Sequence, residues 1–148
     1  MIINGKALLD AAPIKHMFTK KFTENGISFG LTEAGYDIRL KQGITLSPDR
    51  PFALVSAMEE FQMPGCLIGV VHDKSTHARR GIAVQNTVIE PGWRGFLTLE
   101  LTYHGRDNVT LPAGIGIAQV IFHELAEPAH YSGKYQDQAD EPVEAKYE

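Results

Sequence analysis

Short apolar segments recur along most of the chain and are separated by turn residues. From about Ile27 onward, runs such as GYDIRL, CLIGVVH and GFLTLELTYH have the length and composition of β-strands. The segments between them, among them SPDRP, EPGWRG and LPAG, are rich in Gly, Pro and Asp. Short strands at this spacing predict an all-β barrel or sandwich. The predicted strands span residues 35–40, 43–46, 52–58, 59–63, 66–72, 81–84, 95–104 and 115–125.

Two segments have helical rather than strand character. A short helix is predicted from Lys6 to Ala12, ended by Pro13. In DKSTHARR the alternation of apolar and polar residues breaks, and Asp73 or Ser75 is placed to cap a second short helix. This segment is therefore predicted to be a helical insertion within the β fold.

The strand GFLTLELTYH carries a carboxylate in an otherwise apolar and hydroxyl-bearing pattern. Alternation places Phe96, Thr98, Glu100 and Thr102 on one face, and Leu97, Leu99, Leu101 and Tyr103 on the other. A carboxylate in mid-strand is either a solvent-facing residue or, when half-buried near Arg and Ser, a candidate general acid or base. The pattern alone leaves both readings open.

Composition narrows the class of protein without giving a function. The 148 residues, 43% hydrophobic and 22% charged, are ordinary for one globular domain spanning 1–148, and the polar stretch 130–148 is predicted to be a mobile tail. The sequence has no apolar run of membrane-spanning length, and no secretory signal is recognised, so no membrane association is expected. A single cysteine suits the cytoplasm, and a formal charge of −4 argues against nucleic-acid binding.

Several familiar catalytic motifs do not occur in the sequence. A zinc deaminase site needs His-x-Glu followed by Pro-Cys-x-x-Cys, whereas this chain has one cysteine and FHEL has His and Glu adjacent. PAGIGIAQ lacks the Lys-Ser/Thr of a Walker A loop. Ser75 and His77 are two residues apart, which on a helix points them in different directions and argues against a Ser–His hydrolase. No zinc cofactor is expected.

The run HDKSTHARRGIAVQNTVIEPGWRGFLTLEL resembles the dCTP deaminase and dUTPase superfamily. Its deaminase branch reads Gly-Arg-Ser-Ser-x-Ala-Arg-x-Gly, then Ile-Asp-Pro-Gly-Trp-x-Gly, then a strand ending in Leu-Glu. Upstream GYDIRL and downstream YSGKYQDQ are similar to two further family elements, so the resemblance covers about Tyr36 to Gln138. It implies a distorted β-barrel of the dUTPase-like jelly-roll type, assembled as a homotrimer with active sites between subunits.

The resemblance also implies roles for individual residues. Glu100 is expected to be the general base on the water that attacks C4 of cytosine in dCTP, without a metal at the reacting atoms. Arg79 is expected to keep Glu100 ionised and orient the oxyanion, and Ser75 to position the water. Mg²⁺ is expected to bind through the triphosphate. The expected substrate-binding residues are Lys74, Thr76, Asn86, Thr87, Glu90, Trp93, Tyr131, Lys134, Tyr135 and Gln138. His77 and Arg80 are given no role and are interpreted as surface residues.

Alternative activities follow from departures from the family pattern. The segment from Gly81 to Glu90 has the length found in dUTPases, which indicates a dUTPase or a bifunctional deaminase–diphosphatase as the alternative. Against this, Ala83 stands where dUTPases carry the aspartate that activates water. QNTV replaces the residues that contact the base in the deaminases, so dCMP, a 5-modified cytosine nucleotide, or nucleotide binding without turnover remain further alternatives.

Overall fold

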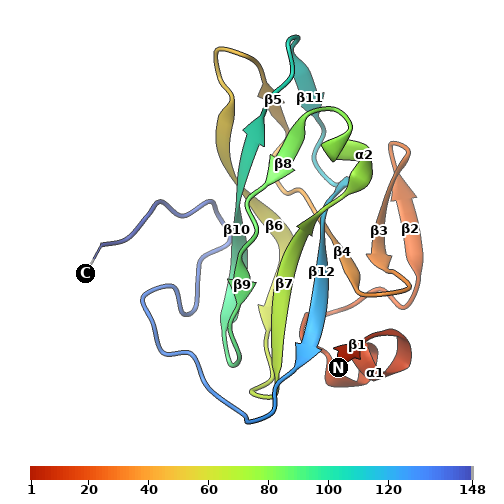
Figure 1. The fold of residues 1–148 in the computed structure, drawn as a ribbon, viewed down its shortest axis with the longest axis vertical. Coiled ribbons are helices and arrows are strands. Elements are labelled where there is room, and N and C mark those ends of the chain that lie inside the picture. Colours follow the sequence, from red (N-terminus) through yellow and green to blue (C-terminus); the bar gives the residue numbers. More distant parts are fainter. Residues whose placement is uncertain (148) are drawn as a thin grey trace.

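The computed structural model describes residues 1–147, and its regular secondary structure is mainly antiparallel β-strand (Figure 1). The strands are β1 (Ile2–Ile3), β2 (Lys21–Glu24), β3 (Ile27–Leu31), β4 (Tyr36–Arg39), β5 (Ile44–Leu46), β6 (Phe52–Gln62), β7 (Leu67–Asp73), β8 (Ile82–Val84), β9 (Val88–Ile89), β10 (Arg94–Tyr103), β11 (Val109–Leu111) and β12 (Gly116–Glu124). The helices are α1 (Gly5–Ala11) and α2 (Ser75–Ala78). The all-β fold class with two short helices is therefore confirmed.

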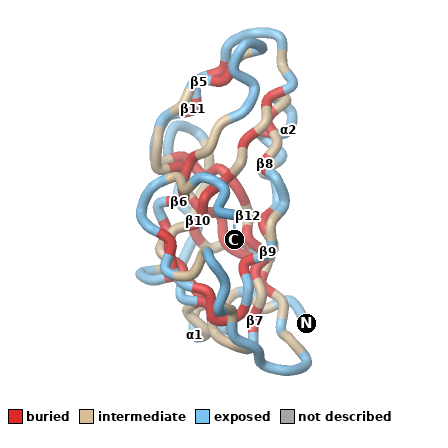
Figure 2. The backbone as a smooth tube through the Cα atoms, turned by 90° about the vertical axis from the view of Figure 1, so that its left-hand side faces the viewer, coloured by how far each residue is buried: buried red, intermediate tan, exposed pale blue. Residues whose placement is uncertain are grey.

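The strands form two main sheets and a small two-stranded one. The larger sheet has the order β2-β3-β4-β12-β7-β9, with β1 also pairing with β12. The second has the order β6-β10-β8, and β11 pairs with β5. The sheets do not close on one another, which is the form of a distorted barrel. Buried residues from both sheets form one apolar cluster, and Figure 2 shows in red the backbone segments that carry buried residues.

The core is built from the inward-facing residues of the alternating strands. On β10, Leu97, Leu99, Leu101 and Tyr103 are all buried, as the alternation predicts. They meet residues such as Tyr36 and Phe122 of the larger sheet, which belong to the same apolar cluster and are at most 1% exposed. Burial of this apolar surface provides most of the driving force for folding.

Some boundaries differ from those expected. Helix α1 begins and ends one residue earlier than predicted, because Ala12 adopts a left-handed conformation (φ 47°) and its N–H bonds the Leu8 carbonyl. The predicted strands 52–58 and 59–63 are one strand, β6, whose pairing with β10 is irregular between Phe96 and Thr98. That irregularity is a bulge in β6, which breaks the alternation and imitates a strand boundary in the sequence.

The β2–β3 hairpin was not predicted, although its turn has a strong sequence signal. Asn25 and Gly26 connect the two strands, and both have positive φ (48° and 76°). Such Asn-Gly turns match the twist of hairpin strands. The short strands β1, β9 and β11 were also missed; β1 and β9 contain two residues each, which is too few to show alternation.

Candidate active site

Glu100 lies in the middle of β10 and points into a cavity of about 450 Å³. Its neighbour across the strand pair on β6 is Leu54, and its carbonyl accepts the Gln85 N–H at 3.0 Å on the side of β8. The carboxylate atom Oε2 is buried and has no hydrogen-bond partner among the described residues. Burial raises the pKa of Glu100 above its ordinary value, more than its backbone hydrogen bond lowers it.

A raised pKa and an unused buried oxygen are what a general base needs, because such a carboxylate gains by taking a proton. Glu100 is half-buried, which corresponds to the second of the two readings of this strand rather than to a fully solvent-facing residue. Gln85 was not predicted as part of the site. Its place beside Glu100 follows from the β8–β10 pairing, which the sequence does not give.

The cavity gathers seven of the residues expected from the sequence. These are Thr87, Glu90, Trp93, Glu100, Tyr131, Tyr135 and Gln138. The remaining wall is mostly apolar and was not predicted: Phe52, Leu54, Val88, Ile89, Leu97, Thr98, Val143, Glu144 and Ala145. Asn86 and Lys134 are exposed and do not line the cavity. The apolar wall comes from three strands and the tail, so only their packing brings it together.

The turn EPGW supplies one rim of the cavity. The Trp93 N–H bonds the Glu90 carbonyl at 3.2 Å, and Gly92 has a left-handed φ of 74°. The Trp93 ring is buried against Phe61, with the ring centroids 6.0 Å apart. Trp93 is therefore a buried support for this rim, and its indole N–H donates to the Tyr135 carbonyl at 2.7 Å.

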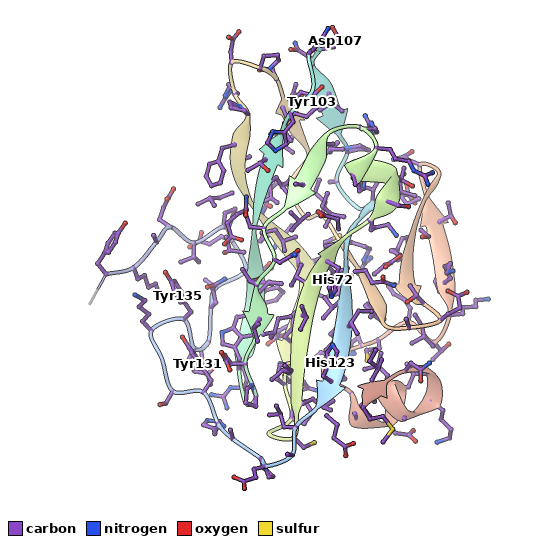
Figure 3. The ribbon with its side chains drawn as sticks, viewed as in Figure 1. His72, Tyr103, Asp107, His123, Tyr131 and Tyr135 are labelled. Atoms are coloured by element: carbon purple, nitrogen blue, oxygen red, sulfur yellow. The ribbon has the colours of Figure 1, made fainter. Side chains whose placement is uncertain are left out.

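The C-terminal segment packs onto β10 beside the cavity. Phe96 N–H donates to the Gln138 carbonyl at 3.0 Å, and the Gln138 side-chain amide donates to the Phe96 carbonyl (2.8 Å) and the Thr98 hydroxyl (2.9 Å). Val143 N–H also donates to Thr98 Oγ1 at 3.0 Å. Figure 3 shows Tyr131 and Tyr135 on this segment, on the side of the molecule where β9 and β10 lie. The mobility expected for residues 130–148 stays a prediction.

Gly95 allows this close approach of the tail. Its φ is 133°, and a Cβ added there would lie within 3.0 Å of three Gln138 backbone atoms. A side chain at this position would therefore push the tail away from β10. Close packing of the tail against β10 therefore explains why the segment GWRG ends in glycine at position 95.

Helix α2 presents its polar side chains away from the cavity. Ser75, Thr76 and Arg79 are exposed, and none of them lines the cavity. Figure 1 places α2 and the C-terminal segment on different sides of the molecule. Within one chain, the expected catalytic group of Glu100, Arg79 and Ser75 is therefore not assembled.

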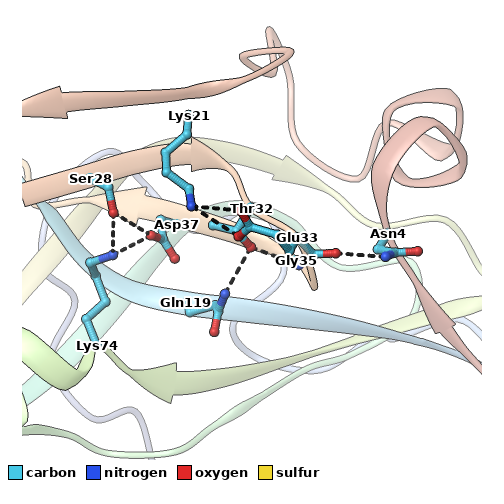
Figure 4. A network of polar contacts seen from close by, with 9 residues as sticks. All are labelled: Asn4, Lys21, Ser28, Thr32, Glu33, Gly35, Asp37, Lys74 and Gln119. Carbon is cyan, nitrogen blue, oxygen red and sulfur yellow. Dashed lines mark hydrogen bonds and ion pairs between the residues drawn. The ribbon is translucent and has the colours of Figure 1, made fainter.

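Lys74, expected at the phosphates, is held by the larger sheet. Its ammonium group forms an ion pair with Asp37 on β4 and donates to Ser28 Oγ on β3 at 3.1 Å (Figure 4). Burial raises the pKa of Asp37, and this outweighs the opposite effect of Lys74. The phosphate contact of Lys74 stays a prediction, but its position is set by this buried pair.

Two expectations about the α2 segment are corrected. Neither Asp73 nor Ser75 caps the helix: Lys74 is the N-cap residue without a side-chain cap bond, and Asp73 Oδ1 accepts the Val84 N–H at 2.6 Å. His77, interpreted as a surface residue, is 1% exposed. It points inward because its position is about half a turn away from Ser75 and Arg79 on the helix.

Within residues 1–147, no group of three or more His, Cys, Asp or Glu side chains is placed to hold a metal ion. In the same part of the chain, none of the helices combines the length and apolar character needed to span a membrane.

Comparison with known proteins places these features in a family. A family model described as dCTP deaminase-like matches residues 11–125. The chain is 33% identical to a dCTP deaminase from Azotobacter vinelandii, over 78% of this chain and 79% of the relative. It is 31% identical to a dCTP deaminase from Helicobacter pylori, over 90% of this chain and 89% of the relative.

Similar solved structures include a dUTPase of the Staphylococcus bacteriophage 80alpha, with a TM-score of 0.59 and 16% identity over 70% of this chain and 84% of that one. The EIAV dUTPase has a TM-score of 0.57 and 20% identity, over 84% of this chain and 92% of that one. At these identities the likeness shows a shared fold.

Proposed function

The chain belongs to the dCTP deaminase-like family, and from this membership we propose that it hydrolyses dCTP to dUTP and ammonia. The observation that carries the proposal is Glu100, a half-buried residue that lines a cavity of about 450 Å³ and whose Oε2 atom has no hydrogen-bond partner among the described residues. Sequence matches of 31–33% to dCTP deaminases, over most of the chain, support dCTP as the substrate.

In the proposed reaction, Glu100 removes a proton from a water molecule that attacks C4 of cytosine. A C4–O bond forms, and Glu100 passes the proton it has taken from water to the ring nitrogen N3, which gives a neutral tetrahedral intermediate. Glu100 then takes the proton of the new C4 hydroxyl group and delivers it to the exocyclic amine. The C4=O bond forms as the C4–N bond breaks, and ammonia leaves. Burial raises the pKa of Glu100 above its ordinary value, so the carboxylate is a stronger base towards the attacking water.

We propose that the complete site needs a second copy of the chain. Ser75 and Arg79 are exposed on α2, whereas Glu100 faces a cavity to which α2 contributes no residue. A homotrimer in which α2 of one subunit covers the Glu100 cavity of the next would bring them together. Phe52 and Val88 at the cavity are 56% and 52% exposed, which supports an apolar contact with another subunit there.

The triphosphate is proposed to bind at the same shared site, with Thr76 and Lys134 as exposed partners. Mg²⁺ fits as an ion held by phosphate oxygens, since the described residues offer no carboxylate cluster of their own. The chemistry that Mg²⁺ supplies is neutralisation of phosphate charge. The amide of Gln138 is bound to Phe96 and Thr98, so any contact between this amide and the phosphates requires the tail to rearrange.

Cleavage of dUTP is the second candidate function, favoured by the dUTPase-like length of the segment from Gly81 to Glu90. Ala83 on β8 argues against it, since its methyl group cannot activate water. A 5-modified cytosine nucleotide is a further candidate substrate, because the apolar residues Leu54 and Val88 line the Glu100 cavity.

The test is ammonia release from dCTP, dCMP and 5-methyl-dCTP, with pyrophosphate release from dUTP measured in parallel. We expect ammonia from dCTP, and its loss in Glu100→Gln. The matched control is Glu127→Gln, an exposed glutamate outside the cavity, which should behave as the wild type. Tight dCTP binding without any ammonia release would instead identify a non-catalytic nucleotide-binding protein.

A further inference from the structure

Helix α2 is too short to be stable by itself. It contains four residues, Ser75–Ala78, and its N-terminus has no side-chain cap. An isolated helical turn is strongly unfavourable in water, because fixing several backbone angles yields only one or two hydrogen bonds. Contacts with the rest of the fold must therefore hold α2 in place. Since Ser75 and Arg79 are carried by this turn and the residue after it, those contacts also set their orientation.

His77 is the buried side chain of this helix. It lies two residues from both Ser75 and Arg79, and therefore points to the opposite side of the turn, into the protein. Its Nε2 lies 2.8 Å from the Gly116 carbonyl oxygen on β12. Pairing between β7 and β12 ends at Asp73 opposite Ala118, so Gly116 lies past the end of that ladder. The His77 side chain therefore forms a hydrogen bond with a β12 carbonyl group that lies outside the pairing between β7 and β12.

The geometry determines the tautomer of His77. A carbonyl oxygen only accepts, so Nε2 must carry the hydrogen. Nδ1 of the neutral ring is then an acceptor, and it is buried with no partner among the described residues. Protonation would convert Nδ1 into a buried donor without an acceptor, which is costly.

The charged groups around His77 also disfavour its protonation. Burial lowers its pKa below the ordinary value of 6.5, and the nearby cations Arg80 and Lys74 lower it further, while the bond to Gly116 acts in the opposite sense. The acids on neighbouring elements are engaged elsewhere: Asp37 on β4 pairs with Lys74, and Asp73 accepts from Val84.

We propose that His77 is a positioning residue that holds α2 against β12 through its neutral Nε2–H tautomer, and so orients Ser75 and Arg79 for the reaction. The inference rests on the proposed function for the role of these two residues, but the anchor itself is independent of activity. Protonation of His77 keeps the Nε2–H bond, but the buried Nδ1–H then has no acceptor and the charged ring is repelled by Arg80 and Lys74, so the buried position of the ring becomes less favourable. Activity is therefore expected to decrease in acid for two reasons, protonation of Glu100 and protonation of His77.

Two variants test the anchor. His77→Gln keeps an N–H donor near the position of Nε2, but its side chain does not titrate. His77→Leu fills a similar space without a hydrogen-bond donor. We expect His77→Leu to lower kcat for ammonia release about 10- to 100-fold, because small displacements of positioning groups have effects of this size. His77→Gln should restore most of the activity. His72→Gln, an exposed histidine in the same stretch, is the control and should match the wild type.

The pH profile separates positioning from a purely structural role. On the acid side, log(kcat/KM) of the wild type should fall with a slope approaching two, one proton each for Glu100 and His77. In His77→Gln the slope should approach one. An unchanged slope in His77→Gln, or full activity in His77→Leu, would overturn the proposal.

NMR of the wild-type protein tests the anchor without any substrate. The ¹⁵N shifts of the His77 ring should identify Nε2 as protonated and Nδ1 as the acceptor, with a pKa below 6.5. A ring protonated on Nδ1 alone, or a pKa at or above 6.5, would overturn the proposal even if the enzyme is active. If no cytosine nucleotide releases ammonia while the NMR result is as expected, the proposed function fails and the anchor stands.

Discussion

The buried pair of Lys74 and Asp37 allows a quantitative test of what fixes the start of α2. The Asp37 side chain is 5% exposed and that of Lys74 is 12% exposed. Removing one partner of a buried ion pair leaves an uncompensated charge and costs about 3–5 kcal/mol. For a chain of this size, each kcal/mol lowers the midpoint of thermal unfolding by about 2–4 °C, so Lys74→Met should lower it by about 6–20 °C.

The two single variants should not be equivalent. In Lys74→Met, Asp37 keeps only the Ser28 hydroxyl, at 3.3 Å, and its carboxylate cannot move into water. In Asp37→Leu, the long Lys74 side chain can turn its ammonium group to solvent, so the loss of stability should be smaller. The double variant Asp37→Leu with Lys74→Met replaces the pair by apolar groups and should recover most of the stability.

The pH dependence follows from the raised pKa of Asp37. A carboxyl group whose pKa is higher in the folded than in the unfolded chain takes up a proton more readily when folded. Without Lys74 the pKa of Asp37 rises further, because burial is then opposed only by the Ser28 hydrogen bond and the charge of Lys21. The stability deficit of Lys74→Met relative to the wild type should therefore shrink as the pH falls from 7 towards 3.8, the ordinary pKa of the group.

The assay is thermal or urea unfolding of the four proteins at one fixed protein concentration, because assembly would make the midpoint concentration-dependent. Strictly additive effects of the two substitutions would refute the coupling that the structure places between them. The same variants test the phosphate role expected for Lys74. If its amine contacts the triphosphate, KM for dCTP should rise most in the two variants that lack the amine and less in Asp37→Leu, which keeps the amine.

Three further predictions concern the site itself. Glu100→Gln should abolish ammonia release yet raise the midpoint of thermal unfolding above that of the wild type at pH 7, because it removes a carboxylate that burial disfavours; a lower midpoint would contradict the assigned burial. An equal mixture of Glu100→Gln and Arg79→Gln chains, denatured and refolded together, should regain about one quarter of wild-type activity if each site takes the two residues from different subunits, and none if both come from one chain. Thr98→Val removes the acceptor of Val143 N–H and one acceptor of Gln138, at a cost of about 1–3 kcal/mol, and should speed amide hydrogen exchange and proteolysis in the tail; unchanged protection would show that these bonds do not hold it.

Much of the β-structure could be predicted because strand formation leaves a local signal with a period of two. The alternation in β10 places Leu99 and Leu101 in the core and Glu100 on the other face, and the structure agrees. The bulge in β6 could not be predicted, since it depends on how this strand pairs with β10. The β2–β3 hairpin was missed for a different reason: its Asn25-Gly26 turn was present in the sequence and was not recognised.

The site likewise has features that sequence motifs predicted and features that only the packing of distant segments revealed. Sequence motifs alone identified Glu100 and the α2 residues Ser75 and Arg79 as candidates, because the order of short motifs along the chain is specific to a family. That one carboxylate oxygen of Glu100 is buried and unpartnered, beside a mostly apolar cavity wall, emerged only from the packing of β6, β9, β10 and the tail. The inward position of His77 and the pairing of Lys74 with Asp37 likewise depend on contacts with distant strands.

By itself, the sequence determined the β class, the family and the residue types available for the chemistry, because alternation and motif order are properties of neighbouring residues. Tertiary structure decided which of these residues face one cavity, which are used to hold the fold, and which point away on α2. Burial, desolvation and ion pairing depend on segments far apart in the chain, so no local pattern contains them. For this protein, the tertiary structure therefore adds to the list of candidate residues the surroundings of Glu100, which lines the cavity with an unpartnered oxygen atom.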